Sequence, residues 1–208
     1  MFGGVARTAV RLLAVSRAGP GFQPAGRAPA PAPLDLVQDF VNTEVPVWAQ
    51  DDIATPDELA AWLRARSLLA EDASVDPVSF LKARALRTLL RELARQNTNG
   101  EATLDSGFRD EFAAVVSDAR LRVELDERGA LRLEPDADGV DGALARILAR
   151  VLEADATGAW RRMKSCPGAH CGWLFYDASR NASSTWCSMS ICGNRAKTAA
   201  YRRRRGES

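Results

Sequence analysis

The sequence predicts an α+β protein, with a mainly helical body that contains one β-hairpin and a small cysteine-rich module behind it. Apolar residues recur at helical spacing through most of residues 34–156. A short stretch around residue 125 alternates apolar and polar residues instead, as a half-buried strand does. All four cysteines fall within residues 166–192. We therefore divide the chain into a disordered extension (1–33), an α+β domain (34–156) and a small cysteine module (157–205).

The N-terminal extension carries four arginines and no acidic residue, which superficially suggests a signal or transit peptide. Its longest apolar run between arginines, Leu12 to Val15, is shorter than the roughly 7–15 residues that an export signal needs. Residues 18–33 are rich in Pro, Ala and Gly and are expected to be disordered, because they bury too little to offset chain entropy. No stretch approaches the roughly 20 apolar residues of a membrane span, so we expect a cytoplasmic protein without a membrane partner.

Helix signals organise the body. Residues 34–43 favour a short buried helix or strand at the start of the ordered chain. Residues 55–58 (Thr-Pro-Asp-Glu) fit a capping box with proline at the first helical position. Asp76-Pro77 repeats this signal, and the helix it opens is expected to end at residues 97–100. A shorter helix is predicted over residues 108–116.

The apolar period changes after residue 120. Leu121, Val123 and Leu125 alternate with charged residues, residues 127–129 form a turn, and the alternation resumes at Leu131. This pattern predicts a β-hairpin. Helical spacing then returns over residues 140–152.

Charge is unevenly distributed along the chain. Residues 34–156 hold 25 of the 27 acidic residues and carry a net charge of about −11, whereas residues 157–208 carry about +8. The net charge of +1 hides this division. A basic segment of such density favours polyanions, because each neutralised phosphate releases condensed counterions.

The four cysteines form two pairs, Cys166 with Cys171 and Cys187 with Cys192. Four residues separate the members of each pair and fifteen residues separate the pairs. Two such hooks supply the four soft donors of a tetrahedral site and predict one structural Zn²⁺. The alternatives are two disulfides or a redox pair, but disulfides belong to oxidising compartments and redox pairs usually have two residues between the cysteines. The lone histidine, His170, is interpreted as a bystander or an outer partner of the site.

The cysteine module is expected to contain two short strands, at residues 172–177 and 184–186, and a helix over residues 196–205. This arrangement indicates a treble-clef-like or ribbon-like zinc finger. Trp173, Phe175 and Trp186 are predicted to form its core; the alternative is that they stack on nucleobases.

The candidate nucleic-acid contacts are the exposed cations of the module. In this interpretation Gly193 allows a tight turn after the last cysteine, Asn194 caps the final helix, and Arg195 contacts base edges or positions the helix. The alternative is that a basic tail only offsets the dipole of its own helix. The complete set is Arg180, Arg195, Lys197, Arg202, Arg203, Arg204 and Arg205.

Asp39, Asn42 and Trp48 are candidates for a ligand pocket in the body. The competing interpretation is that polar side chains beside a buried segment satisfy backbone groups.

Several motifs of the chain also carry a family resemblance. They are Cys166-Pro167, residues 171–175, Asp177, residues 179–181, residues 186–189 and residues 192–197. These motifs resemble the CGNR zinc-finger family, named after the block Cys192 to Arg195. Residues 39–43 are similar to the opening motif of the ABATE domain, which usually precedes this finger. The resemblance implies a bacterial stress-induced transcription regulator whose finger binds DNA. Residues 182–185 depart from the family, which commonly has an arginine-rich stretch there.

Two functions from different classes follow. The first is a zinc-dependent, DNA-binding transcriptional regulator whose body senses a signal or forms a homodimer. The second is a zinc-stabilised module that binds protein or RNA, which the uncharged residues 182–185 favour slightly. An enzyme is not expected, since a closed four-cysteine site has no open position for water and no nucleophile constellation is present.

Overall fold

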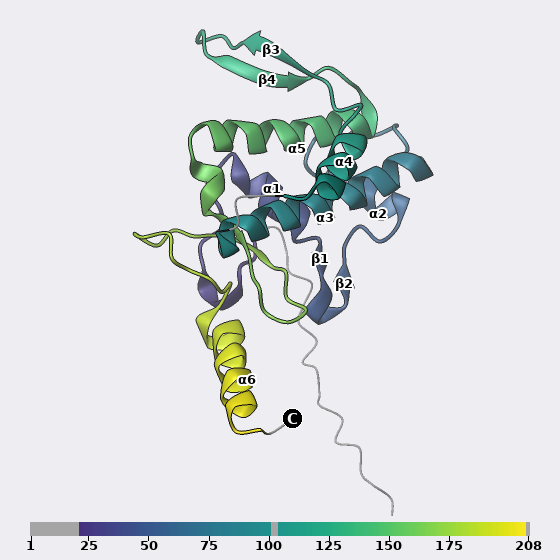
Figure 1. Ribbon diagram of the computed structural model, residues 1–208. Helices are drawn as coiled ribbons and strands as arrows, with labels where there is room; N and C mark the ends of the chain where they lie inside the picture. Colours follow the sequence, from purple (N-terminus) through teal and green to yellow (C-terminus); the bar gives the residue numbers. More distant parts are fainter. Residues whose placement is uncertain (1–20, 101–103, 207–208) are drawn as a thin grey trace, which may run out of the picture.

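The fold is described from a computed structural model, which places residues 21–100 and 104–206. Its body contains α1 (Leu34–Val41), α2 (Pro56–Arg64), α3 (Pro77–Asn99), α4 (Ser106–Val115) and α5 (Gly139–Ala156). Helix α1 contacts both long helices, α3 and α5, so the three share one core (Figure 1). Among the placed residues, no helix is both long and apolar enough to cross a membrane.

The helix ends follow the predicted signals. Thr55 and Glu58 form a reciprocal capping box at the start of α2, with Pro56 in the first turn. Asp76 accepts hydrogen bonds from the backbone N–H groups of Val78 and Ser79 at the start of α3. Gly100 ends α3 in the left-handed conformation, with φ of 74°.

The core of the body is mainly aliphatic, with a few aromatic side chains. Phe40 of α1, Leu86 and Leu90 of α3, and Ile147 of α5 are fully buried within it. Burying each such side chain contributes about 1.5–3 kcal/mol. Residues 34–41, for which the sequence allowed a helix or a strand, form a helix whose apolar side chains enter this core.

The predicted hairpin is confirmed as β3 (Leu121–Leu125) and β4 (Leu131–Pro135), paired antiparallel with Leu125 opposite Leu131. Asp126 closes its turn, because its carboxylate accepts from the backbone N–H groups of Arg128 and Ala130. The hairpin projects from the body beyond α5 (Figure 1).

A second hairpin was not predicted from the sequence. Strands β1 (Glu44–Val45) and β2 (Gln50–Asp51) are two residues each, and two arginines of α3 hold them. Arg87, only 1% exposed, makes a bidentate ion pair with Asp51 at 2.6 and 3.0 Å. Arg91 pairs with Glu44 at 2.6 Å. These buried cations fix the hairpin that bears Trp48 against the cysteine module.

The strand pairing of the cysteine module differs from the prediction. Residues 174–176 form β6 (Leu174–Tyr176) as expected, but its partner is β5 (Met163–Ser165), which precedes the first cysteine. Residues 184–186 form no strand. Their backbone is engaged elsewhere, since Ser184 bonds through both N–H and C=O to the buried Lys164 and Asp177 side chains.

Strand β5 also joins the module to the body. The Asn97 side chain, near the end of α3, donates to the carbonyls of Trp160 and Met163, both at 2.9 Å. Thr98 donates to the Ser165 carbonyl and accepts from the Ser165 N–H. The body and the module therefore pack as one folded unit.

The predicted disordered extension needs correction over residues 21–33; residues 1–20 lie outside the described part of the chain. Residues 21–33 include a short 3₁₀ turn (Pro24–Gly26) and the buried side chains of Gln23 and Ala30. The prediction from composition did not include long-range contacts. The segment is held in place because Gln23, Arg27 and the Phe22 ring contact residues far away in the sequence. These partners compensate for the low apolar content of the segment.

Candidate metal centre and basic helix

The four cysteine sulfurs converge on one point. All four side chains are buried, and their Sγ atoms lie within 4.8 Å of one another. The Cys171–Cys187 and Cys187–Cys192 sulfur separations are both 3.7 Å. A tetrahedron with Zn–S bonds of about 2.3 Å has edges of about 3.8 Å, so the donors fit zinc. A disulfide needs about 2.05 Å, and all four cysteines are free, which excludes the disulfide alternative.

The first hook is shaped by a close backbone approach. Cys166 follows β5, and the Cys171 N–H donates to the Gly168 carbonyl at 2.8 Å. A Cβ on Gly168 would lie 3.2 Å from the Cys192 Sγ and 3.3 Å from the Cys171 Cβ. Glycine therefore lets the backbone run directly beside two ligands. His170 is exposed and is not among the four donors.

The second hook differs from the prediction in its capping. Ser188, not Asn194, caps the turn, because its hydroxyl accepts from the Ile191 N–H at 3.2 Å. The turn η4 (Met189–Gly193) runs directly into α6 (Asn194–Arg204), and Gly193 has helical φ and ψ of −62° and −45°. A Cβ at this position would meet the sulfur of the half-exposed Met189 side chain, which would have to move to make room for it.

The thiols of the cluster influence each other's protonation. Hydrogen bonds from Cys171 and Cys187 lower the pKa of Cys166 to about 2. The same interaction with Cys166 raises the pKa of Cys171 to about 12 and also raises the pKa of Cys187. Burial raises the pKa of Cys192. Zinc binding therefore competes with protons at Cys171, Cys187 and Cys192 and would release those protons from the thiols.

A buried ion pair supports the loop between the hooks. The Lys164 ammonium lies 2.9 Å from Asp177 and also donates to the carbonyls of Ala182 and Ser184. Burial alone would raise the pKa of Asp177, but hydrogen bonds from Ser179, Lys164 and Ser184 lower it well below its usual range. The uncharged segment 182–185 thus supplies backbone partners to this pair. Sequence reasoning missed the role of Lys164, since nothing in the pattern paired it with Asp177.

The three candidate pocket residues have separate contacts. The Asn42 amide pairs with the backbone of Leu174, donating to its C=O and accepting from its N–H, both at 2.8 Å. Asp39 forms an ion pair with Arg66 at 3.3 Å. Trp48 packs against Trp173, with ring centroids 5.4 Å apart. For Asn42, these contacts agree with the alternative to a ligand pocket, in which the polar side chain forms hydrogen bonds with buried backbone groups.

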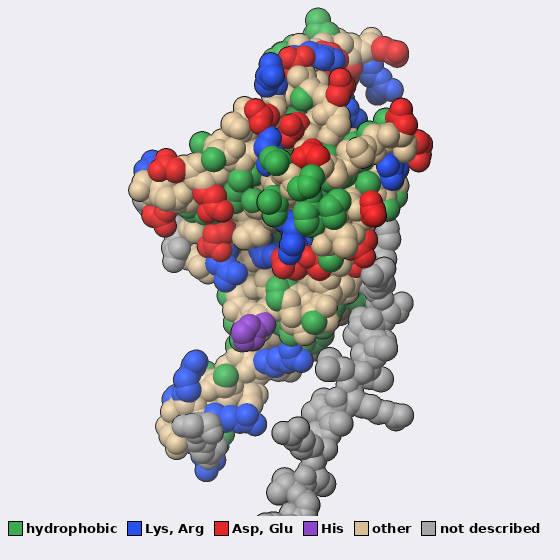
Figure 2. Space-filling model, turned by 90° about the vertical axis from the view of Figure 1, so that its right-hand side faces the viewer, with side chains coloured by type: hydrophobic (Ala, Val, Ile, Leu, Met, Phe, Trp, Pro, Cys, Tyr) green, Lys and Arg blue, Asp and Glu red, His purple; other side chains and the backbone are tan. Residues whose placement is uncertain are grey.

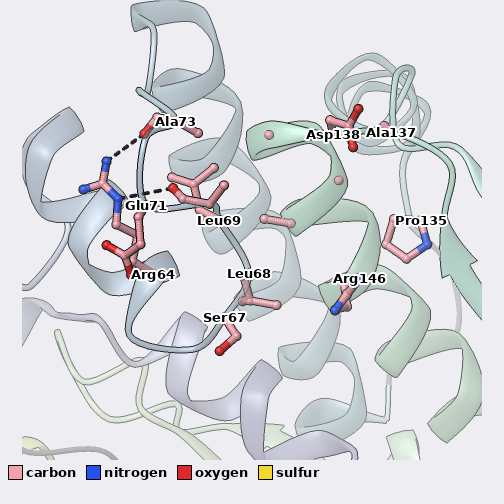
Figure 3. Close-up of a pocket in the computed structure, with 14 residues that line it drawn as sticks. Arg64, Ser67, Leu68, Leu69, Glu71, Ala73, Pro135, Ala137, Asp138 and Arg146 are labelled. Atoms are coloured by element: carbon pink, nitrogen blue, oxygen red, sulfur yellow. Dashed lines mark hydrogen bonds between the residues drawn. The ribbon is translucent and has the colours of Figure 1, made fainter.

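A cavity of about 570 Å³ lies elsewhere in the body, between the loop after α2 and the start of α5. Figure 3 shows Leu68 of the loop on one side and Pro135, Asp138 and Arg146 on the other. Arg64 supports the loop by donating to the carbonyls of Ala70 and Ala73 (Figure 3).

Helix α6 carries most of the predicted nucleic-acid contacts. It has no buried residue and projects from the end of the molecule that holds the cysteines (Figure 1). In Figure 2 Lys and Arg side chains gather on this projection, whereas Asp and Glu side chains spread over the body. The exposed cations are Arg195, Lys197, Arg202, Arg203, Arg204 and Arg205 on or beside the helix, and Arg180 on the separate 177–184 loop.

Arg195 lines two separate hollows on the surface of the module. With Arg202, two turns further along α6, it lines a hollow of about 520 Å³ beside η4. With Arg203 it lines a cleft of about 340 Å³ that also contains Trp186 and Gly168. Arg205 is engaged locally, since it donates to the Tyr201 hydroxyl at 2.7 Å.

The helical body and the four-cysteine centre define a zinc-finger protein whose finger is fused to an α+β domain. Comparison with family models gives two matches. The CGNR zinc finger matches residues 162–205, and the ABATE model, described as "Putative stress-induced transcription regulator", matches residues 34–159. The ABATE match covers more than half of the chain, which therefore belongs to the ABATE family and ends in a CGNR zinc finger. No curated protein matched the chain.

Proposed function

We propose that the protein is a DNA-binding transcriptional regulator of the bacterial cytoplasm, in which zinc fixes the base of α6 and α6 meets the DNA. The observation that carries the proposal is a basic helix without a buried residue that projects from an acidic body. A helix of this kind fits the major groove of DNA, which is about 12 Å wide. The closed four-thiolate centre supports a structural and not a catalytic role for the metal.

The metal site and helix α6 are adjacent along the chain. Cys192 is a ligand and lies three residues before Arg195, so the zinc centre holds the first turn of α6 in place. Arg195 is thus the cation best placed for a defined contact to a base edge or a phosphate. Arg202 and the cations after it lie further from the metal and suit phosphate contacts that are independent of sequence.

The test is a binding titration on duplex DNA, with genomic fragments selected on the zinc-loaded protein. We expect affinity to fall steeply with salt, with a slope of about −0.9 per phosphate neutralised. Arg202→Ala should weaken binding to all sequences and reduce the salt slope by about 1. Arg128→Ala is the matched control, because Arg128 is also exposed but lies on the β3–β4 turn of the acidic body.

Metal removal is the second arm of this test. Chelator-treated protein should lose DNA binding, because α6 would no longer be held at a fixed angle to the finger. Equal binding by zinc-loaded and chelator-treated protein would contradict the proposal.

The body is proposed to sense a signal or to form a homodimer, and its link to stress comes from the family description. The cavity of about 570 Å³ beside α5 has the size of a small-molecule site, which supports sensing.

The second candidate function is a module that binds protein or RNA. It is favoured by residues 182–185, which lack charge and whose carbonyls at Ala182 and Ser184 accept from Lys164. Competition of single-stranded RNA and duplex DNA for the same zinc-loaded protein separates the two. Tighter RNA binding, or a protein partner recovered with no nucleic acid at low salt, favours the second.

A further inference from the structure

A segment outside both family matches contacts the backbone around the second cysteine hook. Arg27 lies seven residues before the ABATE match, yet its guanidinium reaches the second cysteine hook. It donates through Nε to the Cys187 carbonyl, through Nη1 to the Tyr176 carbonyl and through Nη2 to the Trp186 carbonyl, each at 3.2 Å. Its charge also lies 4.6 Å from the centroid of the Phe175 ring, which adds a cation–π contact.

The residues before Arg27 add a second attachment. The Trp173 indole donates to the Gln23 side chain at 3.0 Å, and both side chains are buried. The Phe22 ring packs edge-on against Trp173, with centroids 5.8 Å apart, and against Trp48 at 6.2 Å. The segment therefore contacts the body hairpin and the finger together.

The residues after Arg27 connect to the body. The Ala30 N–H donates to the Gln38 side chain at 2.7 Å, and Gln38 donates in turn to the Leu174 carbonyl of β6. Gln38 is 1% exposed, so these bonds are shielded from water. Residues 21–30 thus run from the aromatic cluster, past the second hook, to α1.

We propose that residues 21–30, here called the strap, lock the second cysteine hook in its metal-binding position and so slow the loss of zinc. Release of the metal requires Cys187 to move away from the other three sulfurs. If the backbone of the second hook moves with Cys187, that movement breaks the bonds from Arg27 to the carbonyls of Cys187 and Trp186. Arg27 is therefore a positioning residue of the metal centre, and this role depends on the zinc site and not on the proposed DNA binding.

The experiment measures zinc transfer from the zinc-loaded, full-length protein to an excess of chromogenic chelator. Arg27→Ala should accelerate transfer about tenfold or more, since one hydrogen bond to a charged group is worth about that factor. Arg64→Ala is the matched control, because Arg64 also holds a loop through two carbonyls but contacts the α2–α3 connection. It should leave the transfer rate within about twofold of the original, as expected for a change outside the release path.

Two milder variants keep the test decisive where Arg27→Ala folds poorly. Arg27→Lys keeps the charge over Phe175 but cannot reach three carbonyls with one planar fork, so its rate should be intermediate. Gln23→Ala removes only the acceptor for Trp173 and should accelerate transfer several-fold. The absorption spectrum of the cobalt-loaded variants should retain four-sulfur character, because the ligands themselves are unchanged.

Loss of zinc from Arg27→Ala during purification, with zinc retained by Arg64→Ala, is the extreme form of the expected result. Transfer rates for Arg27→Lys and Gln23→Ala equal to that of the unaltered protein would overturn the proposal. So would equal acceleration by Arg64→Ala, since the strap would then add only general stability.

Discussion

At the scale of single residues, Asp51 shows how one partly buried carboxylate stabilises an element that the sequence did not predict. Asp51 is 20% exposed at its side chain and pairs with Arg87, whose side chain is 1% exposed. Asp51→Asn should destabilise the fold by about 2–3 kcal/mol, because it removes the closer of the two carboxylates that pair with the buried Arg87 and leaves only Glu44 at 3.8 Å. Chemical denaturation measures the change. Asp52→Asn is the control, since the Asp52 carboxylate accepts hydrogen bonds from the uncharged Gln50 side chain; an equal loss in both variants would refute the explanation.

The same carboxylate predicts a pH dependence. Burial would raise the pKa of Asp51, but the hydrogen bond and charge of Arg87 outweigh it and lower the pKa below 3.8. The unfolded chain therefore binds a proton more readily than the folded one. The contribution of Asp51 is complete above about pH 5 and is lost as pH falls through the unfolded-state and then the folded-state pKa. Stability curves between pH 5 and 2 should be flatter for Asp51→Asn than for the unaltered protein; parallel curves would contradict this.

Gly168 gives a residue-scale prediction for the metal. An added Cβ would lie 3.2–3.3 Å from Cys192 and Cys171, which is closer than ordinary contact, and both neighbours are ligands with little freedom. Gly168→Ala should therefore weaken zinc binding by about 1–3 kcal/mol, the usual cost of overpacking. A competition titration with a chelator measures it. Ala169→Gly is a control at the exposed neighbouring position, and unchanged affinity in Gly168→Ala would count against the packing explanation.

At the scale of elements, helix α3 carries both buried core positions and exposed surface positions. Leu86 is fully buried, whereas Leu81 is 63% exposed. Leu86→Ala should cost about 2–5 kcal/mol in the free energy of unfolding, and Leu81→Ala less than about 0.5 kcal/mol. Denaturant unfolding of both variants checks this. Similar losses in the two variants would mean that the exposed end of α3 is covered by a partner.

The elements also show how far sequence reasoning extends. The capping box at Thr55, the cap at Asp76 and the β3–β4 turn were predictable because each is a local signal within a few residues. The β1–β2 hairpin and the β5–β6 pairing were not, since they depend on Arg87 of α3 and on a strand before the cysteines. The four ligands followed from spacing alone. The contacts of Arg27 join positions about 150–160 residues apart, and no local pattern encodes them.

At the scale of the whole molecule, the metal and the body should lose stability together. The finger core contains Val45 of the body hairpin beside the four cysteines and Phe175, and β5 packs on α3 through Asn97 and Thr98. Removing zinc would therefore free β5 and expose the end of α3 as well as the finger. We expect chelation to lower the melting temperature of the single unfolding transition, because a ligand that binds only the folded state stabilises all of it.

Amide hydrogen exchange would measure how far this loss spreads. Zinc-free protein should lose protection in β5, in β6 and over the last two turns of α3, while the Leu86 region of α3 keeps most of its protection. The hairpin β3–β4 serves as an internal control, because it projects from the body on the far side of α5 from the cysteines (Figure 1). A separate low-temperature transition for the finger, with unchanged protection throughout α3, would mean that the finger folds as an independent domain. The hydrogen bonds from Asn97 to Trp160 and Met163 argue against that independence, since they place finger and body in one hydrogen-bonded core.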